Sequence, residues 1–341
     1  MTAKESQSLS LYALAAPVAA LCYPFLLALF HLEVIRAGAA SAVLSSLLLL
    51  MALAVPFVGI YGFRTLGTVG NPSMREVRAR TLALVFVGTP PLYTALGVVL
   101  TMLHNPISDL VAWVILWAAM TAVALVPRRA DSSAPLAKPH LFPRLRFAHG
   151  VSAAAILLIF LALHLVNHLA GLWSADLHRA LMSQFRHIYR ARLVEPILVT
   201  LLLFQITSGP ILVWQYAKHR VGSWRTLQIA SGVYLFFYLV SHMNSVFIYA
   251  RTYEGVQTDW DFATGAPTGL LRDAWNIRLL PHYLLGVFFV LTHLVLGARI
   301  VALAHDVPVG TVDRLAITGI TLAAAVAISI ILGMVGIHIG R

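Results

Sequence analysis

The sequence predicts an all-α, polytopic membrane protein with about nine transmembrane helices. Hydrophobic residues make up 60% of the 341 positions and charged residues only 11%, whereas a soluble domain has roughly 25% charged residues. Apolar runs repeatedly reach the roughly 20 residues that a helix needs to cross the hydrocarbon core. The chain has too few charged residues for a soluble fold of its length, so we expect it to lie in a lipid bilayer.

The expected transmembrane helices are the apolar runs between charged segments and segments rich in proline and glycine. Pro56 and the Pro90–Pro91 pair fall inside the second and third runs and predict kinks there. The nine runs cover residues 11–31, 41–62, 82–103, 110–127, 147–172, 193–216, 226–250, 279–304 and 314–338.

The formal charge of +11 comes from short basic clusters between the apolar runs. That distribution is typical of cytoplasmic loops under the positive-inside rule, and it does not favour nucleic acid as a partner. We therefore expect a multi-pass protein of the bacterial inner (cytoplasmic) membrane with a cytoplasmic N-terminus. The clusters precede the third, fifth and seventh runs and comprise Arg64, Arg75, Arg78 and Arg80, then Arg128, Arg129, Lys138, Arg144 and Arg146, then Lys218, Arg220 and Arg225.

The segment 128–146, with its prolines, serines and basic residues, is the best internal boundary. It predicts a four-helix membrane region of unknown role at 1–143 and a five-helix region at 144–341. Within the second region, residues 173–192 carry four arginines among spaced apolar residues. This pattern predicts an amphipathic helix on the membrane surface.

Several kinds of chemistry are excluded by what the sequence lacks. Cys22 is the only cysteine, so there is no disulfide framework, no Cys-ligated zinc or iron–sulfur cluster and no covalent haem attachment. No G-x-G-x-x-G motif, no P-loop and no soluble stretch long enough for a flavin is present. Asp259 and Asp261 form a D-x-D pattern in the loop 251–278, but we expect that loop to be a solvated cap.

Two histidines share one expected depth in the bilayer. His164 lies about seventeen residues into the run 147–172, and His242 lies about sixteen residues into the run 226–250. Both runs are expected to point the same way, so at about 1.5 Å per residue the two imidazoles sit at one level in the outer half of the bilayer. Six-coordinate b-type haem needs such a pair from separate helices. The alternative is that each histidine hydrogen-bonds to a neighbouring helix.

A second depth match joins His293 to Gln205, toward the inner half of the bilayer. Each of these residues precedes a glycine by four positions, so Gly209 and Gly297 lie one helical turn away. These glycines either make room for a flat ring or simply pack helices together, which is the usual role of small residues in membranes. Glutamine is not a normal haem ligand.

Residues 144–341 resemble a known family on these motifs. The stretch RLRFAHGVSAAAILLIFLALHLVNH, which contains His149 and His164, resembles its first helix, and LQIASGVYLFFYLVSHMNS with His242 resembles its third. VEPILVTLLLFQITSG resembles the second helix and YLLGVFFVLTHLVLG, with His293, the fourth. The family is the cytochrome b membrane-anchor subunit of succinate dehydrogenase and fumarate reductase, of the five-helix, two-haem type. The resemblance implies that His164 and His242 ligate an outer haem and that His293 belongs to an inner haem.

Two departures from the family pattern concern the inner haem. Gln205 stands where the family has a ligand histidine, and Ile229 stands where it has an arginine. The resemblance therefore implies one haem b, with His164 and His242 as its iron ligands, and an inner haem that is absent or altered.

The resemblance also gives Glu195 a role. This glutamate begins the sixth run beside Arg190 and Arg192. It is either an interfacial residue paired with those arginines or, as in the family, the carboxylate that accepts protons from quinol. His168, one turn beyond His164, is expected either to support it by hydrogen bonding or to lie at the interface.

Three functions follow from these patterns. The first is electron transfer through haem b and a quinone in a respiratory chain, as at most the quinone and haem subunit of an oxidoreductase whose other protein subunits supply or remove electrons. The second is a haem-less anchor or structural subunit of a larger respiratory or photosynthetic complex. The third is a transporter that uses the kinked helices and the intramembrane histidines.

Overall fold

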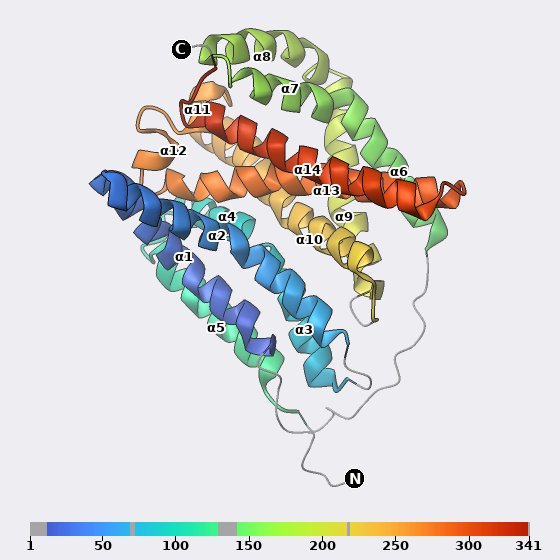
Figure 1. Ribbon diagram of the computed structural model, residues 1–341. Helices are drawn as coiled ribbons and strands as arrows, with labels where there is room; N and C mark the ends of the chain where they lie inside the picture. The colour runs from blue at the N-terminus through green and yellow to red at the C-terminus, as the bar shows by residue number, and fades with distance from the viewer. Residues whose placement is uncertain (1–11, 69–71, 129–141, 217–218, 340–341) are drawn as a thin grey trace, which may run out of the picture.

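The computed structural model describes residues 12–68, 72–128, 142–216 and 219–339, and these form helices without a β-strand (Figure 1). Arg129, Lys138 and Lys218 of the predicted cytoplasmic loops lie outside the described residues. The predicted N-terminal region contains α1 (Tyr12–Arg36), α2 (Ala39–Leu66), α3 (Met74–Val87), α4 (Thr89–Met102) and α5 (Asp109–Leu125).

The predicted C-terminal region contains the remaining helices. Its π-helical segments are η1 (Leu157–Leu161) and η2 (Asn244–Glu254), and its one 3₁₀ turn within the described residues is η3 (Asn276–Arg278). Its α-helices are α6 (Pro143–Ile156), α7 (Ala162–Ala170), α8 (Ala175–Tyr189), α9 (Val194–Tyr216), α10 (Ser223–Met243), α11 (Trp260–Thr264), α12 (Gly269–Arg272), α13 (Leu279–Ala304) and α14 (Val309–Met334).

Seven helical segments within the described residues are long and apolar enough to cross a membrane, and an eighth is formed if the bent pair α3–α4 counts as one span. The predicted count of nine requires α5 as well, and α5 has only 17 residues. A multi-pass membrane protein is therefore confirmed, but the number nine is not. Two of the seven segments are continuous through short irregularities, because α6, η1 and α7 form one run and α10 continues into η2.

The third predicted span is broken at the predicted proline pair. α3 and α4 meet at 69°, with Gly88 between them and Pro90 and Pro91 in the first turn of α4, where a missing N–H costs no helical hydrogen bond. A Cβ on Gly88 would lie 2.2 Å from the ring of Phe237 in α10. The bend thus brings the α3–α4 corner against α10. Pro56, the other predicted kink, lies inside an uninterrupted α2.

The N-terminal helices pack around a group of aromatic side chains. The ring of Phe86 stacks on Trp117 at 4.3 Å, and Trp113 meets Trp117 edge-on at 5.1 Å. The indole N–H of Trp113 donates to the carbonyl of Ala20 at 2.8 Å, so a buried donor is satisfied between α5 and α1. The same buried core continues into the C-terminal region through residues such as Leu279.

Four segments of the C-terminal region form an up-and-down bundle. α9 packs against both α6 and α10, and α10 packs against α13. Ring contacts join α6 to α13 through His149 and His293, and α7 to α10 through His164 and His242. α9 runs antiparallel to α6, since Gln205 reaches Ser152 while the later Ser208 reaches the earlier His149. α13 and α14 lie side by side across the molecule (Figure 1).

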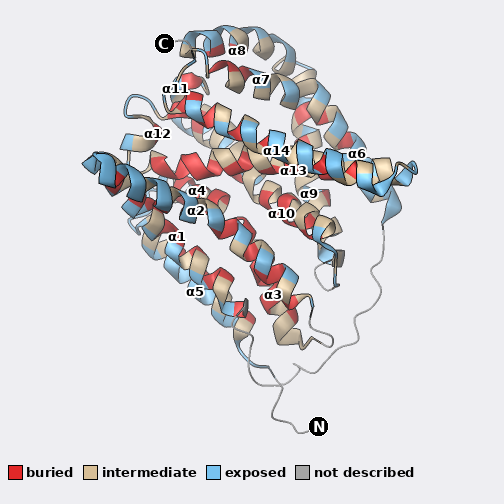
Figure 2. Ribbon diagram, in the orientation of Figure 1, coloured by how far each residue is buried: buried red, intermediate tan, exposed pale blue. Residues whose placement is uncertain are grey.

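The chain end is tied to the top of this bundle. A Cβ on Gly333 of α14 would lie 2.7 Å from the backbone of Gly171, just after α7, and the N–H of Ile339 donates to the carbonyl of Leu172 at 2.9 Å. Buried residues follow α13, whereas the outward faces of α2 and α8 are largely exposed (Figure 2). Large apolar side chains on outward faces, including Leu158 and Leu193, are the surface expected to contact lipid.

The segment 173–192 contains the predicted amphipathic helix, α8. Ser174 caps it by accepting from the N–H of Leu177 at 3.0 Å, and its apolar side includes the buried Met182. In the loop 251–278, Asp259 caps α11 and Asp261 binds Arg179 at 2.8 Å. Both carboxylates of the D-x-D pattern are therefore used by the protein itself.

Candidate functional site

The structure brings the rings of His164 and His242 together in an edge-on arrangement. His164 lies in α7 and His242 lies in the last turn of α10, and their ring centroids are 6.3 Å apart with an angle of 68° between the ring planes. Within the described residues neither imidazole has a hydrogen-bond partner. The sequence predicted this pair from depth alone. The alternative was that each histidine hydrogen-bonds to a neighbouring helix, and no such bond is present within the described residues.

The separation of these two rings is one at which His164 and His242 would both be able to hold the same metal ion. A ring nitrogen lies about 2.0–2.1 Å from a bound metal ion and about 1.1 Å from its own centroid, so opposed imidazole ligands have centroids roughly 6.3 Å apart. The angle between the planes is not restrictive, because each ring can turn about its own metal–nitrogen bond. The donor set of two imidazoles is the one that a six-coordinate b-type haem takes.

Both helices that carry this pair depart from α-helical geometry next to the histidine. η1 ends three residues before His164, and η2 begins two residues after His242. Such π-helical turns inside α-helices are frequent at functional sites. Flanking rings hold the imidazoles: Phe160 stacks on His164 at 4.7 Å, and Tyr238 stacks on His242 at 5.4 Å with only 9° between the planes.

A further group of imidazoles extends from His164 toward α8. His168 meets His164 edge-on at 4.6 Å, and the ring of His178 lies 5.2 Å from that of His168. The side-chain amide of Asn167 donates to Nε2 of His178 at 3.0 Å. The Nδ1 atoms of His168 and His178 are buried without a partner, so His168 belongs to a buried cluster with His178 and Asn167.

His178 lies outside the predicted spans and is 1% exposed. Burial lowers the pKa of its imidazole to about 4, and the charges of Arg179 and Arg186 act in the same direction, opposed by Asp259. Its ring also rests on Trp260 of α11 at 4.5 Å. His178 is therefore neutral at physiological pH and closes the cluster on the α8 side.

Glu195 has a different partner from the one expected. Its carboxylate accepts from Arg251 of η2 at 2.6 Å, with both side chains about a third exposed, whereas Arg190 donates to Thr258. The expected pairing with Arg190 and Arg192 is thus replaced by an ion pair to a residue far along the chain. The pair joins the start of α9 to the segment that follows His242.

The structure gives His293 a partner that the depth argument did not. The rings of His293 in α13 and His149 in α6 have centroids 6.5 Å apart, with 80° between the planes. Gln205 instead donates from Nε2 to the carbonyl of His149 at 2.8 Å and to the hydroxyl of Ser152. The expected match of His293 with Gln205 is therefore replaced by a second pair of histidines.

The two predicted glycines have different surroundings. A Cβ on Gly209 would lie 3.9 Å from the ring of His149, which is ordinary contact, whereas a Cβ on Gly297 would meet nothing within 4 Å. A glycine that the sequence did not single out lies closer to an imidazole than these two: a Cβ on Gly232 of α10 would lie 3.1 Å from Cε1 of His293. Gly232 therefore lets His293 approach the backbone of α10.

Sequence reasoning missed His149 as part of a pair and missed His178 entirely. A usable signal existed for His149, because its fifteen-residue spacing from His164 is close to four helical turns and puts both on roughly one face. His178 carried no such signal, since its partners come from α7 and α11. Among the described residues, no group of three or more His, Cys, Asp and Glu side chains could hold a metal ion.

The chain was compared with known proteins at three levels, those of family, curated sequence and solved structure. No family model matches it, and neither the curated proteins nor the solved structures contain a match.

Proposed function

We propose that this protein is a membrane electron-transfer protein, or the membrane subunit of an oxidoreductase, that holds haem b between His164 and His242 and exchanges electrons with a quinone. The observation that carries the proposal is the 6.3 Å separation of these two rings, with no hydrogen-bond partner on either ring within the described residues. The proposal extends the resemblance to the cytochrome b anchor of succinate dehydrogenase and fumarate reductase. Bound haem would supply one-electron transfer inside the bilayer.

The surroundings of the pair favour haem over a hydrated metal ion. Two protein ligands are enough for haem, because the porphyrin fills the other four positions on the iron. Phe160 and Tyr238 give the imidazoles flat apolar neighbours. Their stacking fixes ring orientation without engaging the nitrogens, so both rings stay available as ligands.

Glu195 is the residue that we assign to proton uptake from quinol. Its carboxylate is held by Arg251, directly after the helix that carries His242. A positioned carboxylate can take a proton from a hydroxyl within hydrogen-bond reach. The neighbouring η2 segment would place the quinone ring on the same side of the bundle as the His164–His242 pair, which we expect to be the outer side of the cytoplasmic membrane.

The test is a spectrum of the purified full-length protein, expressed in a host supplied with haem precursor. We expect a reduced-minus-oxidised difference spectrum with a b-type α-band. His164→Ala and His242→Ala should each abolish the low-spin signal of this site. His305→Ala serves as the matched control, because His305 is exposed and hydrogen-bonds only to the carbonyl of Val301.

Quinone chemistry needs its own measurement. Glu195→Gln should keep the haem spectrum but slow its reduction by a soluble quinol by at least about tenfold, since a positioned general base contributes roughly 10²–10⁴ in rate. A protein that takes up no haem under these conditions would favour the haem-less anchor subunit. If the protein contains haem but quinol reduces it equally fast in Glu195→Gln, the electron-transfer proposal stands and Glu195 has no part in it.

A further inference from the structure

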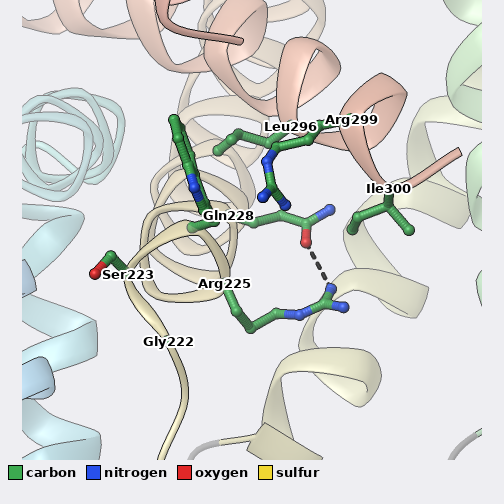
Figure 3. Close-up of a pocket in the computed structure, with 8 residues that line it drawn as sticks. Gly222, Ser223, Arg225, Gln228, Leu296, Arg299 and Ile300 are labelled. Carbon is green, nitrogen blue, oxygen red and sulfur yellow. Dashed lines mark hydrogen bonds between the residues drawn. The ribbon is translucent and has the colours of Figure 1, made fainter. Parts of the chain in front are cut away.

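A cavity of about 270 Å³ lies between the start of α10 and the last part of α13. Arg225 of α10 and Arg299 of α13 both line it, and Figure 3 shows their side chains pointing into the space between the two helices. The cavity is smaller than the roughly 300–1,000 Å³ of sites that enclose a drug-sized molecule. Its volume therefore suits a headgroup or a small ion.

The charge at this cavity is positive. Asp313 of α14 accepts from Nε and Nη2 of Arg299 at 2.9 and 2.6 Å, which neutralises one of the two guanidinium groups. Arg225 donates to the neutral side chain of Gln228 at 2.6 Å, and no carboxylate pairs with it in the part of the chain that the structure describes. Arg146, near the start of α6, is close enough to add to the positive potential. An anion in the cavity would therefore meet a guanidinium without a counter-charge.

The backbone at the start of α10 adds hydrogen-bond donors to the same wall. Gly222 is the N-cap residue, and without a side chain it cannot accept from the first N–H groups of the helix. Gly222, Ser223 and Trp224 all line the cavity. The unused N–H groups and the positive end of the helix thus reinforce the charge that Arg225 supplies.

The opposite wall of the cavity is apolar. Leu296 and Ile300 line it one turn apart on α13, and the ring of Trp224 lies against the guanidinium of Arg299 at 4.8 Å. A cavity with a cationic wall and an apolar wall suits an amphiphile better than a free inorganic ion, because an ion gains nothing from the apolar side chains.

The cavity lies at the level of the lipid headgroups. The candidate spans that contain α10 and α13 have 32 and 29 residues, whereas roughly 20 residues cross the hydrocarbon core. Arg225 is the third residue of α10, and Arg299 lies five residues before the end of α13, so both fall in the excess length near the membrane surface. Basic residues predict that this end of the bundle is cytoplasmic, and the cytoplasmic leaflet carries anionic lipids.

We propose that this cavity binds the phosphate group of an anionic phospholipid, with Arg225 and the first N–H groups of α10 as donors to the phosphate oxygens. Arg225 also lies over the ring of Tyr216 in α9 at 5.3 Å, and Arg299 is bonded to Asp313 of α14. A bound lipid would therefore link the ends of four helices and stabilise the bundle. This site does not depend on haem or on the proposed function.

The test follows the unfolding midpoint of the purified full-length protein in a neutral detergent as phosphatidylglycerol, phosphatidylcholine or inorganic phosphate is added. We expect phosphatidylglycerol to raise the midpoint until the site is saturated, because it binds the folded state, and the other two to raise it much less. Arg225→Gln should weaken the apparent affinity for phosphatidylglycerol by about tenfold or more, since a hydrogen bond between charged groups is lost. Arg314→Gln is the matched control, because Arg314 is exposed at the same end and bonds to the carbonyl of Gly310.

Gly222 allows a second test that does not weaken the fold. A Cβ there would meet nothing within 4 Å, and its extended backbone suits a capping side chain. Gly222→Asp and Gly222→Asn should both cap α10, but only the aspartate places a negative charge where the phosphate would bind. We therefore expect Gly222→Asp to lose most of the phosphatidylglycerol effect and Gly222→Asn to lose less.

The possible results separate a specific lipid site from its alternatives. An equal shift in Arg225→Gln, Gly222→Asp and Arg314→Gln would show general attraction to the basic surface and overturn the site, as would the absence of any shift. An equal response to inorganic phosphate would assign the cavity to free phosphate and overturn the lipid. An equal response to phosphatidylcholine would overturn the requirement for a net negative charge. Loss of the shift in Arg225→Gln and Gly222→Asp alone would support the proposal, whether or not the protein contains haem.

Discussion

The two histidine pairs differ in how their rings are held, although their ring separations are nearly equal. His164 and His242 are fixed by stacking on Phe160 and Tyr238 and have no hydrogen-bond partner within the described residues. His149 and His293 are fixed by serine hydroxyls. Packing holds one pair and polar contacts hold the other, so different substitutions should disturb each.

The local backbone differs in the same way. The first pair sits beside the π-helical segments η1 and η2, whereas His149, Ser231 and His293 lie in regular α-helix. A π-helical turn shifts the side chains that follow it around the helix axis. At the first pair, where no hydrogen bond orients the rings, the π-helical backbone sets their direction. At the second pair the serine hydroxyls orient the rings, so a regular α-helix is sufficient.

The largest expected effect comes from adding a methyl group beside a stacked ring. In Gly286→Ala the new Cβ would lie 2.3 Å from the ring of Tyr238, which stacks on His242. Overpacking of this kind costs about 1–3 kcal/mol, and we expect the His164–His242 haem to be lost or weakened and the unfolding midpoint to fall. Haem content and thermal unfolding in detergent measure both effects.

Gly232→Ala is the matched variant at the other pair. Its Cβ would lie 3.1 Å from His293, a milder conflict, so the unfolding midpoint should fall less than in Gly286→Ala and the haem signal of the first pair should be unchanged. Gly297→Ala is the control, because nothing lies within 4 Å of its Cβ. A loss of the haem signal in Gly232→Ala as large as that in Gly286→Ala would mean that the two pairs are not independent.

The sequence predicted one pair and not the other for a physical reason. His164 and His242 could be matched because both helices were expected to run the same way, so counting residues gave the depth of each. For His293 the same counting pointed to Gln205, because α9 and α13 run in the same direction. Depth alone does not say which side chain faces the ring, and Gln205 is turned toward the backbone of His149.

The membrane-spanning character and the break near Pro90–Pro91 could also be predicted, because composition and proline act locally. The number of spans could not, since α5 is apolar yet has only 17 residues. Neither could the Glu195–Arg251 contact, because the two residues are 56 positions apart. Such contacts depend on how helices are placed against one another, which residue periodicity does not encode.

The next largest expected effect is a dependence of stability on pH that comes from His178, on the His164–His242 side of the bundle. Burial, together with Arg179 and Arg186, lowers the pKa of His178 from its ordinary 6.5 to about 4. The neutral form is therefore favoured in the folded protein, and the stability it contributes is complete above about pH 6.5 and is lost as the pH falls toward 4. Thermal unfolding between pH 7.5 and 4.5 should show a falling midpoint over roughly that range.

His178→Phe separates this effect from general acid sensitivity. The phenyl ring keeps the contact with Trp260 but cannot take up a proton, so the unfolding midpoint should vary less with pH. The substitution also removes the hydrogen bond to Asn167. An unchanged pH profile in His178→Phe would assign the acid sensitivity to other groups.

A smaller effect is expected from the serines of the second pair. Ser208→Ala and Ser231→Ala each remove the hydroxyl that is hydrogen-bonded to an imidazole Nδ1, which costs about 0.5–1.5 kcal/mol. The unfolding midpoint should therefore fall slightly in both variants. The midpoint potential of the haem at the first pair should not move, and a shift would show that the serines act through the whole bundle.

The smallest effect concerns the ion pairs at the two ends. Arg251 makes one bond to Glu195 and lies over the ring of Phe247 at 4.6 Å, whereas Arg299 makes two bonds to Asp313 and lies over Trp224 at 4.8 Å. Partly exposed pairs are worth about 0.2–1 kcal/mol, and two-bond contacts to one guanidinium lie at the upper end.

We therefore expect Asp313→Asn to lower the unfolding midpoint more than Glu195→Gln, with both shifts shrinking at high salt because the charges reach solvent. Thermal unfolding of the two variants side by side, at low and at high salt, decides this. A larger shift in Glu195→Gln would mean that the number of bonds to the guanidinium does not set the strength of these two ion pairs.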